Sequence, residues 1–170
     1  MNHVTEDWEP TTSAIHLLRR AFQHVTAYWT DTVGTTLTTA QFAILAVLVT
    51  DDKEFDQATL GERLGLDSST GSYLIKRLER DGLVGVAMDQ TNRRRNLITI
   101  TDEGLRVVSA VFPPAREAEE AILSRLSPAD RDRLMSLLRQ LIGIEPGDEG
   151  VSTTDEGGAG PAIARPGLRS

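Results

Sequence analysis

Short hydroxyl and basic side chains gather in two stretches of this sequence, and together they have the chemistry needed to bind a nucleic acid. Hydroxyl groups hydrogen-bond to base edges and phosphate oxygens, whereas lysine and arginine bind phosphates through their charge. The hydroxyl residues come first; basic residues follow one to three helical turns later and again in a run of three arginines. The residues are Ser68, Ser69, Thr70 and Ser72, then Lys76, Arg77 and Arg80, and finally Arg93, Arg94 and Arg95.

The segments around the hydroxyl residues predict a helix-turn-helix. A short helical pattern spans residues 56–64, a tight turn follows at residues 65–67, and a second helical pattern spans residues 68–80. The inward side of the second helix is expected to carry Tyr73, Leu74, Ile75 and Leu78. A recognition helix enters the major groove by its N-terminal end, where short side chains can approach the bases. The hydroxyl residues lie at that end of the second helix.

Two strand-like runs after the helices predict a β-hairpin. They cover residues 83–88 and 96–100, and the loop 89–95 between them carries the three arginines. The tip of such a hairpin, a wing, can deliver arginine into a narrow minor groove. Isolated basic residues usually mark only a solvated face, and the arginine run alone would not decide the matter. The fixed order of helix, turn, helix and hairpin is what predicts a winged helix that docks on double-stranded DNA.

The charge of the chain is distributed unevenly. The 170 residues carry a net charge of −7, which by itself argues against a nucleic-acid-binding protein. Residues 68–96, however, contain six basic and three acidic side chains, so this segment is positive within an acidic chain. A local basic surface is the feature expected of a DNA-binding protein. The length suits one domain with a core, or a small dimerising unit.

The residues needed for most enzyme and metal chemistry are missing or badly spaced. There is no cysteine, and His16 and His24 are eight residues apart, roughly 12 Å along a helix and too far for one metal ion. Neither a phosphate-binding glycine motif nor a serine-hydrolase motif occurs. We therefore expect no enzyme activity, cofactor or metal. The N-terminus is polar and the longest apolar run, residues 42–49, is far shorter than the roughly 20 residues of a membrane span, so we expect a cytoplasmic protein with no membrane partner.

Helical patterns on both sides of residues 36–101, the predicted DNA-binding lobe, carry apolar stripes that have no domain of their own to fill. The first stripe has large side chains at three- to four-residue spacing: Ile15, Leu18, Phe22, Val25 and Trp29. The simplest use of the helices in residues 12–34 and 102–143 is a homodimer interface, because winged helices commonly bind DNA as two-fold pairs. The alternative is that they only complete a monomeric core. Residues 1–11 are expected to be frayed, and residues 144–170 to form a disordered tail.

Capping residues and prolines predict where the helices begin and end. The candidate caps are Thr12 or Ser13, Thr38 or Thr39, Thr101, and Ser127. Pro113 and Pro114 should break or kink the helix after Thr101, because proline lacks a backbone donor and clashes with the preceding turn. The sequence thus predicts a mainly α protein with a small β-hairpin, in which a winged helix-turn-helix is flanked by N- and C-terminal dimerisation helices.

Four short patterns occur in a fixed order along residues 12–143. They are Leu37-Thr38-x-x-Gln41-Phe42, Leu60-x-x-Arg63-Leu64-Gly65, Ile75-x-Arg77-Leu78-Glu79 and Leu97-x-Thr99-x-Thr101-x-x-Gly104. In this combination the chain resembles the MarR family of bacterial transcription regulators. One departure is Asn92, because the family's wing usually carries aspartate before its arginine pair. Asn92 can still accept a hydrogen bond from arginine but lacks the charge.

The resemblance implies a homodimer whose two recognition helices bind a palindrome in double-stranded DNA. It also implies repression that is relieved by a small molecule, commonly an aromatic acid or a phenol, bound between the DNA-binding lobe and the dimerisation helices. The residues that match the family's recognition helix and wing are Ser68, Ser69, Thr70, Ser72, Tyr73, Lys76, Arg77, Arg93 and Arg94. The arginine run adds Arg95 to these candidate DNA contacts.

The run Leu18-Arg19-Arg20-x-x-Gln23 is also similar to regulators of aromatic carboxylate catabolism. A guanidinium group beside aromatic side chains can bind an aromatic carboxylate bidentately. His16, Arg20 and His24 are spaced by four residues and share one face of a helix. We therefore expect the effector at Arg20 first, and then at Arg19, His16 and His24. The alternative is that both arginines lie on the surface or pair with acids across the dimer.

One other function stays open, that of a winged-helix protein-interaction module without specific DNA binding. The two functions differ in how DNA affinity depends on salt, because a repressor neutralises phosphates and releases counterions. Affinity that falls steeply as salt rises would identify the DNA-binding protein.

Overall fold

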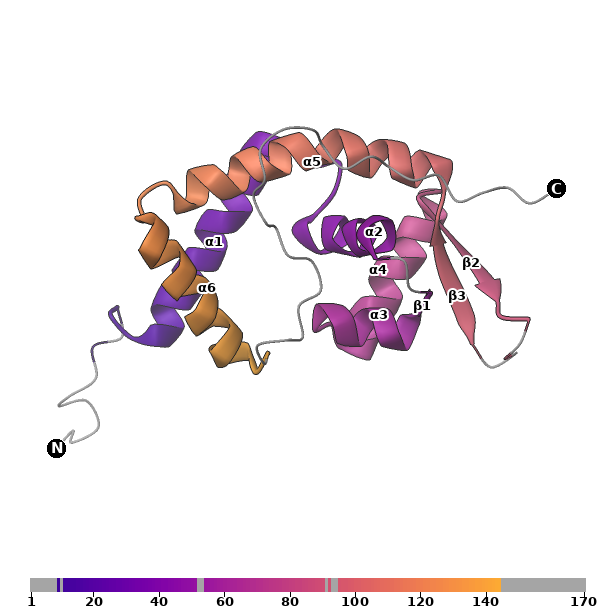
Figure 1. The fold of residues 1–170 in the computed structure, drawn as a ribbon, viewed down its shortest axis with the longest axis horizontal. Helices are drawn as coiled ribbons and strands as arrows, with labels where there is room; N and C mark the ends of the chain where they lie inside the picture. The colour runs from indigo at the N-terminus through magenta and orange to yellow at the C-terminus, as the bar shows by residue number, and fades with distance from the viewer. Residues whose placement is uncertain (1–8, 10, 52–53, 91, 93–94, 145–170) are drawn as a thin grey trace, which may run out of the picture.

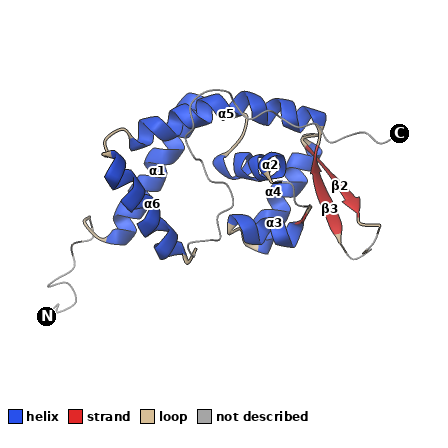
Figure 2. Cartoon of the chain, viewed as in Figure 1, coloured by secondary structure: helices blue, strands red, loops and turns tan. Residues whose placement is uncertain are grey.

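The computed structural model describes residues 9, 11–51, 54–90, 92 and 95–144, and it shows a mainly helical chain with one small sheet. The elements in order are α1 (Ala14–Val33), α2 (Thr39–Thr50), β1 (Phe55–Asp56), α3 (Gln57–Leu64), α4 (Ser68–Arg80), β2 (Val84–Met88), β3 (Asn96–Ile100), α5 (Asp102–Leu123) and α6 (Pro128–Ile142). The sheet lies at one end of an elongated molecule, α1 and α6 lie at the other, and α5 spans the distance between them (Figures 1 and 2). The predicted fold class is confirmed.

The helices begin where the sequence places hydroxyl caps. Ser13, Thr38, Thr101 and Ser127 each accept a hydrogen bond from the backbone amide three residues ahead. Thr38 and Gln41 form a reciprocal capping box, because the Gln41 side chain also accepts from the Thr38 amide at 3.0 Å. These side chains satisfy amides that have no partner within a helix, and they fix the start of four helices.

The core sits mainly in the lobe made by α2, α3, α4 and the sheet. Its most deeply buried side chains are Leu37, Ile44, Leu45, Leu60, Leu78 and Val108. Val108 belongs to α5, so the long helix completes this core. The rings of Trp29, Phe42 and Phe112 join α1, α2 and α5, with centroids 5.3 Å and 5.2 Å apart, and the Trp29 indole donates to the Leu37 carbonyl at 2.7 Å. The first helix is therefore attached to the lobe by its C-terminal half.

The sheet has three antiparallel strands in the order β1-β3-β2, one more than the predicted hairpin. β1 pairs Phe55 with Ile98 and Asp56 with Leu97, whereas β2 pairs along the whole of β3 from Val84 to Met88. β1 has only two residues, and its conformation depends on a partner about 40 positions away. No local pattern could have predicted it.

Pro113 and Pro114 do not interrupt α5, so the expected break is wrong. The helix runs without interruption for 22 residues and contains both prolines. Buried side chains lie on the same helix both before and after them: Val108, Val111, Ala115 and Ala118. Packing on both sides of the prolines holds the helix together, although proline removes hydrogen bonds from the preceding turn.

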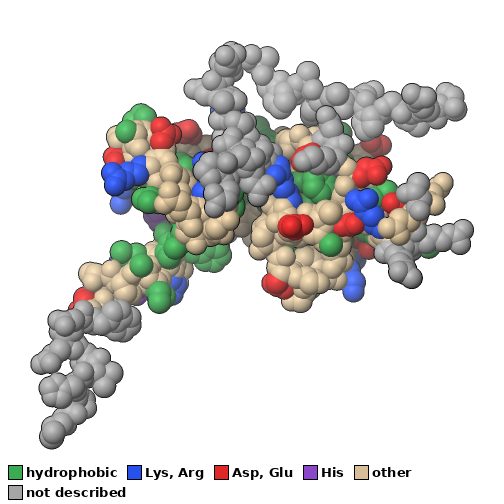
Figure 3. Space-filling view, turned by 60° about the horizontal axis from the view of Figure 1, so that its bottom comes forward, with side chains coloured by type: hydrophobic (Ala, Val, Ile, Leu, Met, Phe, Trp, Pro, Cys, Tyr) green, Lys and Arg blue, Asp and Glu red, His purple; other side chains and the backbone are tan. Residues whose placement is uncertain are grey.

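Neither α1 nor α6 contains a buried residue, although both carry the apolar stripes seen in the sequence. Their exposed large side chains include Ile15, Leu17, Leu18 and Phe22 on α1, and Met135, Leu137, Leu141 and Ile142 on α6. Hydrophobic side chains gather on this end of the molecule, on the left of Figure 3. A chain in water does not usually leave so much apolar surface uncovered. Among the described residues no helix is both long and apolar enough to cross a membrane.

Candidate nucleic-acid interface

The recognition helix α4 has the bounds that the sequence predicts, Ser68–Arg80. Gly71, Leu74, Ile75 and Leu78 are buried and attach one side of the helix to the lobe. Tyr73, expected to face inward, is instead 63% exposed. Three consecutive residues of a helix span about 200°, so residues 73–75 cannot all face the core. Tyr73 therefore lies outside the core, as a DNA-contacting residue would.

The hydroxyl residues at the start of α4 are organised by Asp67, the residue that caps this helix. Oδ1 of Asp67 accepts from the Ser69 amide at 3.0 Å, the Ser69 hydroxyl at 2.5 Å and the Thr70 amide at 2.9 Å; Oδ2 accepts from the Thr70 hydroxyl at 2.6 Å. These bonds, with the Ser69 and Thr70 hydroxyls contributing most, hold the pKa of Asp67 far below its usual range. Asp67 is therefore ionised at any physiological pH, and it fixes both hydroxyl protons.

The basic residues of α4 lie on its exposed side. Lys76, Arg77 and Arg80 are all exposed. Arg80 forms an ion pair with Asp81 at 2.9 Å, and Arg77 approaches the same carboxylate at 3.9 Å. Ion pairs between exposed groups contribute little to stability, so both guanidinium groups can exchange this carboxylate for a phosphate. The α4 surface thus carries hydroxyl groups at its start and positive charge along its later turns.

Of the three arginines expected at the tip of the wing, the structure describes Arg95 alone. Arg93 and Arg94 lie outside the described residues. Arg95 turns back to the lobe, where its Nε lies 2.6 Å from Oδ2 of Asp56 and its side chain is 30% exposed. The backbone amide of Asn92 donates to Oδ1 of Asp89 at 3.3 Å, so a buried aspartate three residues before Asn92 holds this turn. Arg95 therefore contacts its own chain, and the DNA contact expected of it from the sequence stays a prediction.

The start of α5 is fastened to the end of α4. The Thr101 amide donates to the Leu83 carbonyl at 3.1 Å, and its hydroxyl donates to the Gly82 carbonyl at 2.7 Å. Gly82 has φ 73°, in the left-handed region that favours glycine, and follows the end of the recognition helix. At Gly104 the two segments approach so closely that a Cβ atom would lie 2.0 Å from the Leu83 carbonyl oxygen. The start of α5 is therefore in direct contact with the residues that end the recognition helix.

The four candidate effector residues, Arg19, Arg20, His16 and His24, all lie on α1. Three of them share one face of this helix, and Arg19 does not. Arg19 donates to the Gln23 side chain at 2.9 Å, and His24 packs edge-on against Tyr28 with ring centroids 4.9 Å apart. Arg20 is exposed, and His16 is half-buried. Arg20 shares its helix face with His16 and His24, as the four-residue spacing predicts. In one chain this face is open to solvent.

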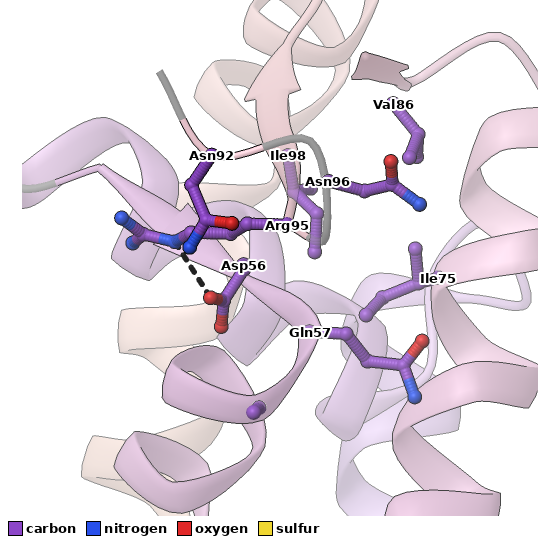
Figure 4. A pocket seen from close by; sticks show the side chains of 9 residues that line it. Asp56, Gln57, Ile75, Val86, Asn92, Arg95, Asn96 and Ile98 are labelled. Carbon is purple, nitrogen blue, oxygen red and sulfur yellow. Dashed lines mark hydrogen bonds and ion pairs between the residues drawn. The ribbon is translucent and has the colours of Figure 1, made fainter. Parts of the chain in front are cut away.

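The structure shows a cavity elsewhere, between the wing and the helices of the lobe (Figure 4). Its volume is about 430 Å³. The lining residues come from β1, α3, α4 and the wing: Asp56, Gln57, Ala58, Ile75, Val86, Asn92, Arg95, Asn96 and Ile98. None of the candidate effector residues lines it. No local pattern predicts this cavity, because its walls come from segments up to about 40 residues apart.

Comparisons with known proteins relate the chain to one family of regulators. A model of the MarR family matches residues 35–95. The transcriptional regulator HosA of Escherichia coli O127:H6 is 31% identical over 129 residues, which cover 76% of this chain and 94% of HosA. No group of three or more histidine, cysteine, aspartate or glutamate side chains that could hold a metal occurs among the described residues.

Two solved structures share the fold along most of their length. PcaV from Streptomyces coelicolor, in complex with its natural ligand, is 32% identical with a TM-score of 0.77, covering 82% of this chain and 98% of PcaV. BpsR from Bordetella bronchiseptica, whose DNA binding is regulated by 6-hydroxynicotinic acid, is 30% identical with a TM-score of 0.74, covering 79% of this chain and 96% of BpsR. With its capped recognition helix, three-stranded wing and α5 linkage, this chain belongs to the MarR family of DNA-binding transcriptional regulators.

Proposed function

We propose that the protein is a homodimeric repressor that binds a palindromic operator and is released from it by a small aromatic carboxylic or phenolic compound. The observation that carries the proposal is that two different kinds of exposed surface lie at the two ends of the chain. Hydroxyl and basic groups cover α4 at one end, apolar side chains cover α1 and α6 at the other, and α5 joins the two. A second copy that covers the apolar end would place two recognition helices on one DNA duplex.

In this dimer the effector would act through α5. A ligand changes the DNA affinity only if it binds one arrangement of the recognition helices better than the other. A compound held between α1 and the lobe would favour one position of α5, and the contacts of Thr101 and Gly104 with residues 82–83 would transmit that position to α4. The aromatic class is supported by the resemblance and by 6-hydroxynicotinic acid as the regulator of BpsR.

The direct test is binding to DNA from the region upstream of the protein's own gene, measured by fluorescence anisotropy at several salt concentrations. A repressor should prefer this DNA to random DNA, and its affinity should fall steeply with salt, because each neutralised phosphate adds about 0.9 to the slope of log affinity against log salt. The alternative, a protein-interaction module, predicts weak binding with no preference for sequence.

The Asp67 cap restricts which DNA groups Ser69 and Thr70 can bind. Each hydroxyl donates its only proton to the carboxylate, so towards DNA it can act only as an acceptor. Phosphates are acceptors, whereas the amino groups of adenine and cytosine in the major groove are donors. We therefore expect these two hydroxyls to recognise adenine or cytosine and not the backbone.

Asp67→Asn should lower sequence discrimination while it raises the affinity for random DNA. Asparagine caps a helix as well as aspartate does, but its amide group cannot accept both hydroxyl protons. At least one hydroxyl is then free to donate to phosphate, guanine or thymine. We expect the ratio of specific to non-specific affinity to fall roughly tenfold, equivalent to about 1.4 kcal/mol. Asp132→Asn, at an exposed acid of α6, is the matched control, and unchanged discrimination in Asp67→Asn would disprove the assignment.

Arg20→Ala should leave operator binding intact and abolish the response to effector. The residue lies on α1, far along the chain from the recognition helix, but a guanidinium is needed to pair with a carboxylate effector. We expect the effector concentration for half-release to rise at least about tenfold, equivalent to 1.4 kcal/mol. Arg125→Ala removes the same charge from another exposed position. Release of Arg20→Ala at the wild-type concentration would rule Arg20 out as a ligand-binding residue.

A further inference from the structure

The cavity shown in Figure 4 lies between the lobe helices and the described wing residues Asn92, Arg95 and Asn96. Its apolar lining includes Ile75 of α4 facing Val86 and Ile98 of the sheet. Towards the tip the lining becomes polar, with Gln57 of α3 opposite Asn96 of β3. Val84 and Ile98 of the sheet belong to the buried core, whereas Asn92 and Asn96, which lie nearer the turn of the wing, are exposed. Apolar packing therefore does not hold these two residues against the lobe.

Arg95 provides a connection at this point. Its Nε donates to Oδ2 of Asp56 at 2.6 Å, and its Nη2 donates to the Glu54 carbonyl oxygen at 3.2 Å. The backbone of the same residue closes the wing turn, since its amide donates to the Asn92 carbonyl at 2.8 Å and its carbonyl accepts from the Asp89 amide at 2.9 Å. Arg95 thus joins the turn of the wing to the segment that begins α3.

Asp56 is anchored independently of the wing. Its Oδ1 accepts from the Thr59 amide at 2.9 Å and from the Thr59 hydroxyl at 2.9 Å, which caps α3. The Thr59 amide, followed by the Thr59 hydroxyl and Arg95, lowers the pKa of this carboxyl, although partial burial opposes the shift. Asp56 is consequently a fixed negative charge at neutral pH.

The ion pair between Asp56 and Arg95 lies just beyond the last backbone pair of β1 with β3. β1 pairs with β3 only at residues 55–56, and its last pair joins Asp56 to Leu97. Arg95 lies two residues beyond Leu97 towards the tip, so its side chain extends the attachment of the wing past the end of the strand ladder. Asp56 and Arg95 expose 19% and 30% of their side chains, and a partly buried pair is screened less by salt than an exposed one.

We propose that Arg95 is a positioning residue, which holds the wing at a fixed angle to the recognition helix through Asp56 and does not itself contact DNA. The inference rests on the proposed function, in which the wing and α4 bind the same operator. It gives an acidic residue, Asp56, a supporting role in binding a polyanion. Simple electrostatics predicts the opposite, because removing a negative charge near DNA should strengthen binding.

The test uses Asp56→Asn, Arg95→Gln and the double variant in the full-length protein, with operator affinity measured by fluorescence anisotropy. Asparagine keeps the α3 cap, and thermal unfolding of each variant confirms that the fold is retained. We expect both single variants to weaken operator binding by about tenfold, and the double variant to be no weaker than either. This lack of additivity is the signature of two residues that act as one unit. Glu62→Gln, which removes an exposed acid of α3 in the same lobe, should not weaken binding.

Two results would overturn the inference. If Arg95→Gln weakens binding while Asp56→Asn leaves it unchanged or strengthens it, Arg95 contacts DNA directly. If neither variant changes operator affinity, the ion pair does not position the wing for binding. The wild-type titration separates these results from a failure of the proposed function, since a wild type that does not prefer operator to random DNA would overturn the function and with it the inference.

Discussion

Replacing Leu141 with glutamate should convert the protein to monomers and weaken operator binding by at least about 100-fold, equivalent to roughly 2.7 kcal/mol. Leu141 lies on α6 and is 63% exposed in one chain. If the apolar end of the molecule is covered by a second copy, glutamate at this position would have to lose its hydration without gaining a partner, which is costly. A monomer would then bind only half of a palindrome.

The distribution of exposed apolar side chains supports this expectation. The exposed large hydrophobic residues of the described chain lie on α1, on α6 or just after it, with two exceptions: Tyr73 on the recognition helix and Met88 on the wing. The first group would form the dimer interface, and the two exceptions lie on the proposed DNA-binding surface. Solvent-exposed apolar side chains therefore concentrate at the two places where the proposed function requires a partner.

Analytical ultracentrifugation measures the mass directly. The measured mass of the wild type should be about twice the chain mass of 18.6 kDa, and that of Leu141→Glu should equal the mass of one chain. Ser136→Glu is the matched control, because it adds the same charge to an exposed position of α6 outside the apolar stripe. A dimeric Leu141→Glu variant, or a monomeric wild type that binds operator with full affinity, would refute the interface assigned to α6.

Gly104→Ala should lower the free energy of unfolding by about 3 kcal/mol, the upper end of overpacking costs, and the melting temperature by about 6–12 °C. An added Cβ would lie 2.0 Å from the Leu83 carbonyl oxygen and 2.9 Å from Cγ1 of Ile100. The first of these is a backbone atom, which cannot rotate away. Either α5 moves off the end of α4 or the bonds made by Thr101 break, and both changes disturb the link to the recognition helix.

Gly71→Ala is the control for this substitution. Gly71 is also a buried helical glycine, but an added Cβ there would lie 4.0 Å from Cβ of Leu66, an ordinary contact distance. Alanine is favoured over glycine within helices by about 1 kcal/mol, so Gly71→Ala should be neutral or stabilising. The melting temperatures of the two variants are measured by thermal unfolding and compared. Equal melting temperatures would show that the α4–α5 junction is not tightly packed.

Local patterns predicted most of the helices correctly, because caps and turn residues act on their immediate neighbours. The bounds of α4 follow from Asp67 before it and Gly82 after it. The failures involve contacts between distant segments. The break expected at Pro113 and Pro114 is prevented by packing of α5 on α1 and α2, and β1 forms only by pairing with β3.

In the candidate site, too, local features could be predicted from the sequence and contacts between distant segments could not. The hydroxyl and basic residues of α4 were identified from their order in the sequence, and the structure places them on the exposed side of that helix. The pairing of Arg95 with Asp56 could not be predicted from a local pattern, because the two residues are 39 positions apart. The prediction that Tyr73 faces the core is wrong. The helical period places Tyr73 and Ile75 on different sides of α4, so both cannot lie in one narrow buried arc with Leu74 and Leu78.

The most direct test of the central claim is a fluorescence anisotropy titration of the wild-type protein on its upstream DNA, with and without a panel of hydroxylated benzoates, cinnamates and pyridine carboxylates. We predict tight, salt-sensitive binding to this DNA and its relief by at least one compound of the panel. Tight binding that no compound relieves would contradict the aromatic effector and retain the DNA-binding regulator. Binding no tighter than to random DNA would contradict repression at this site.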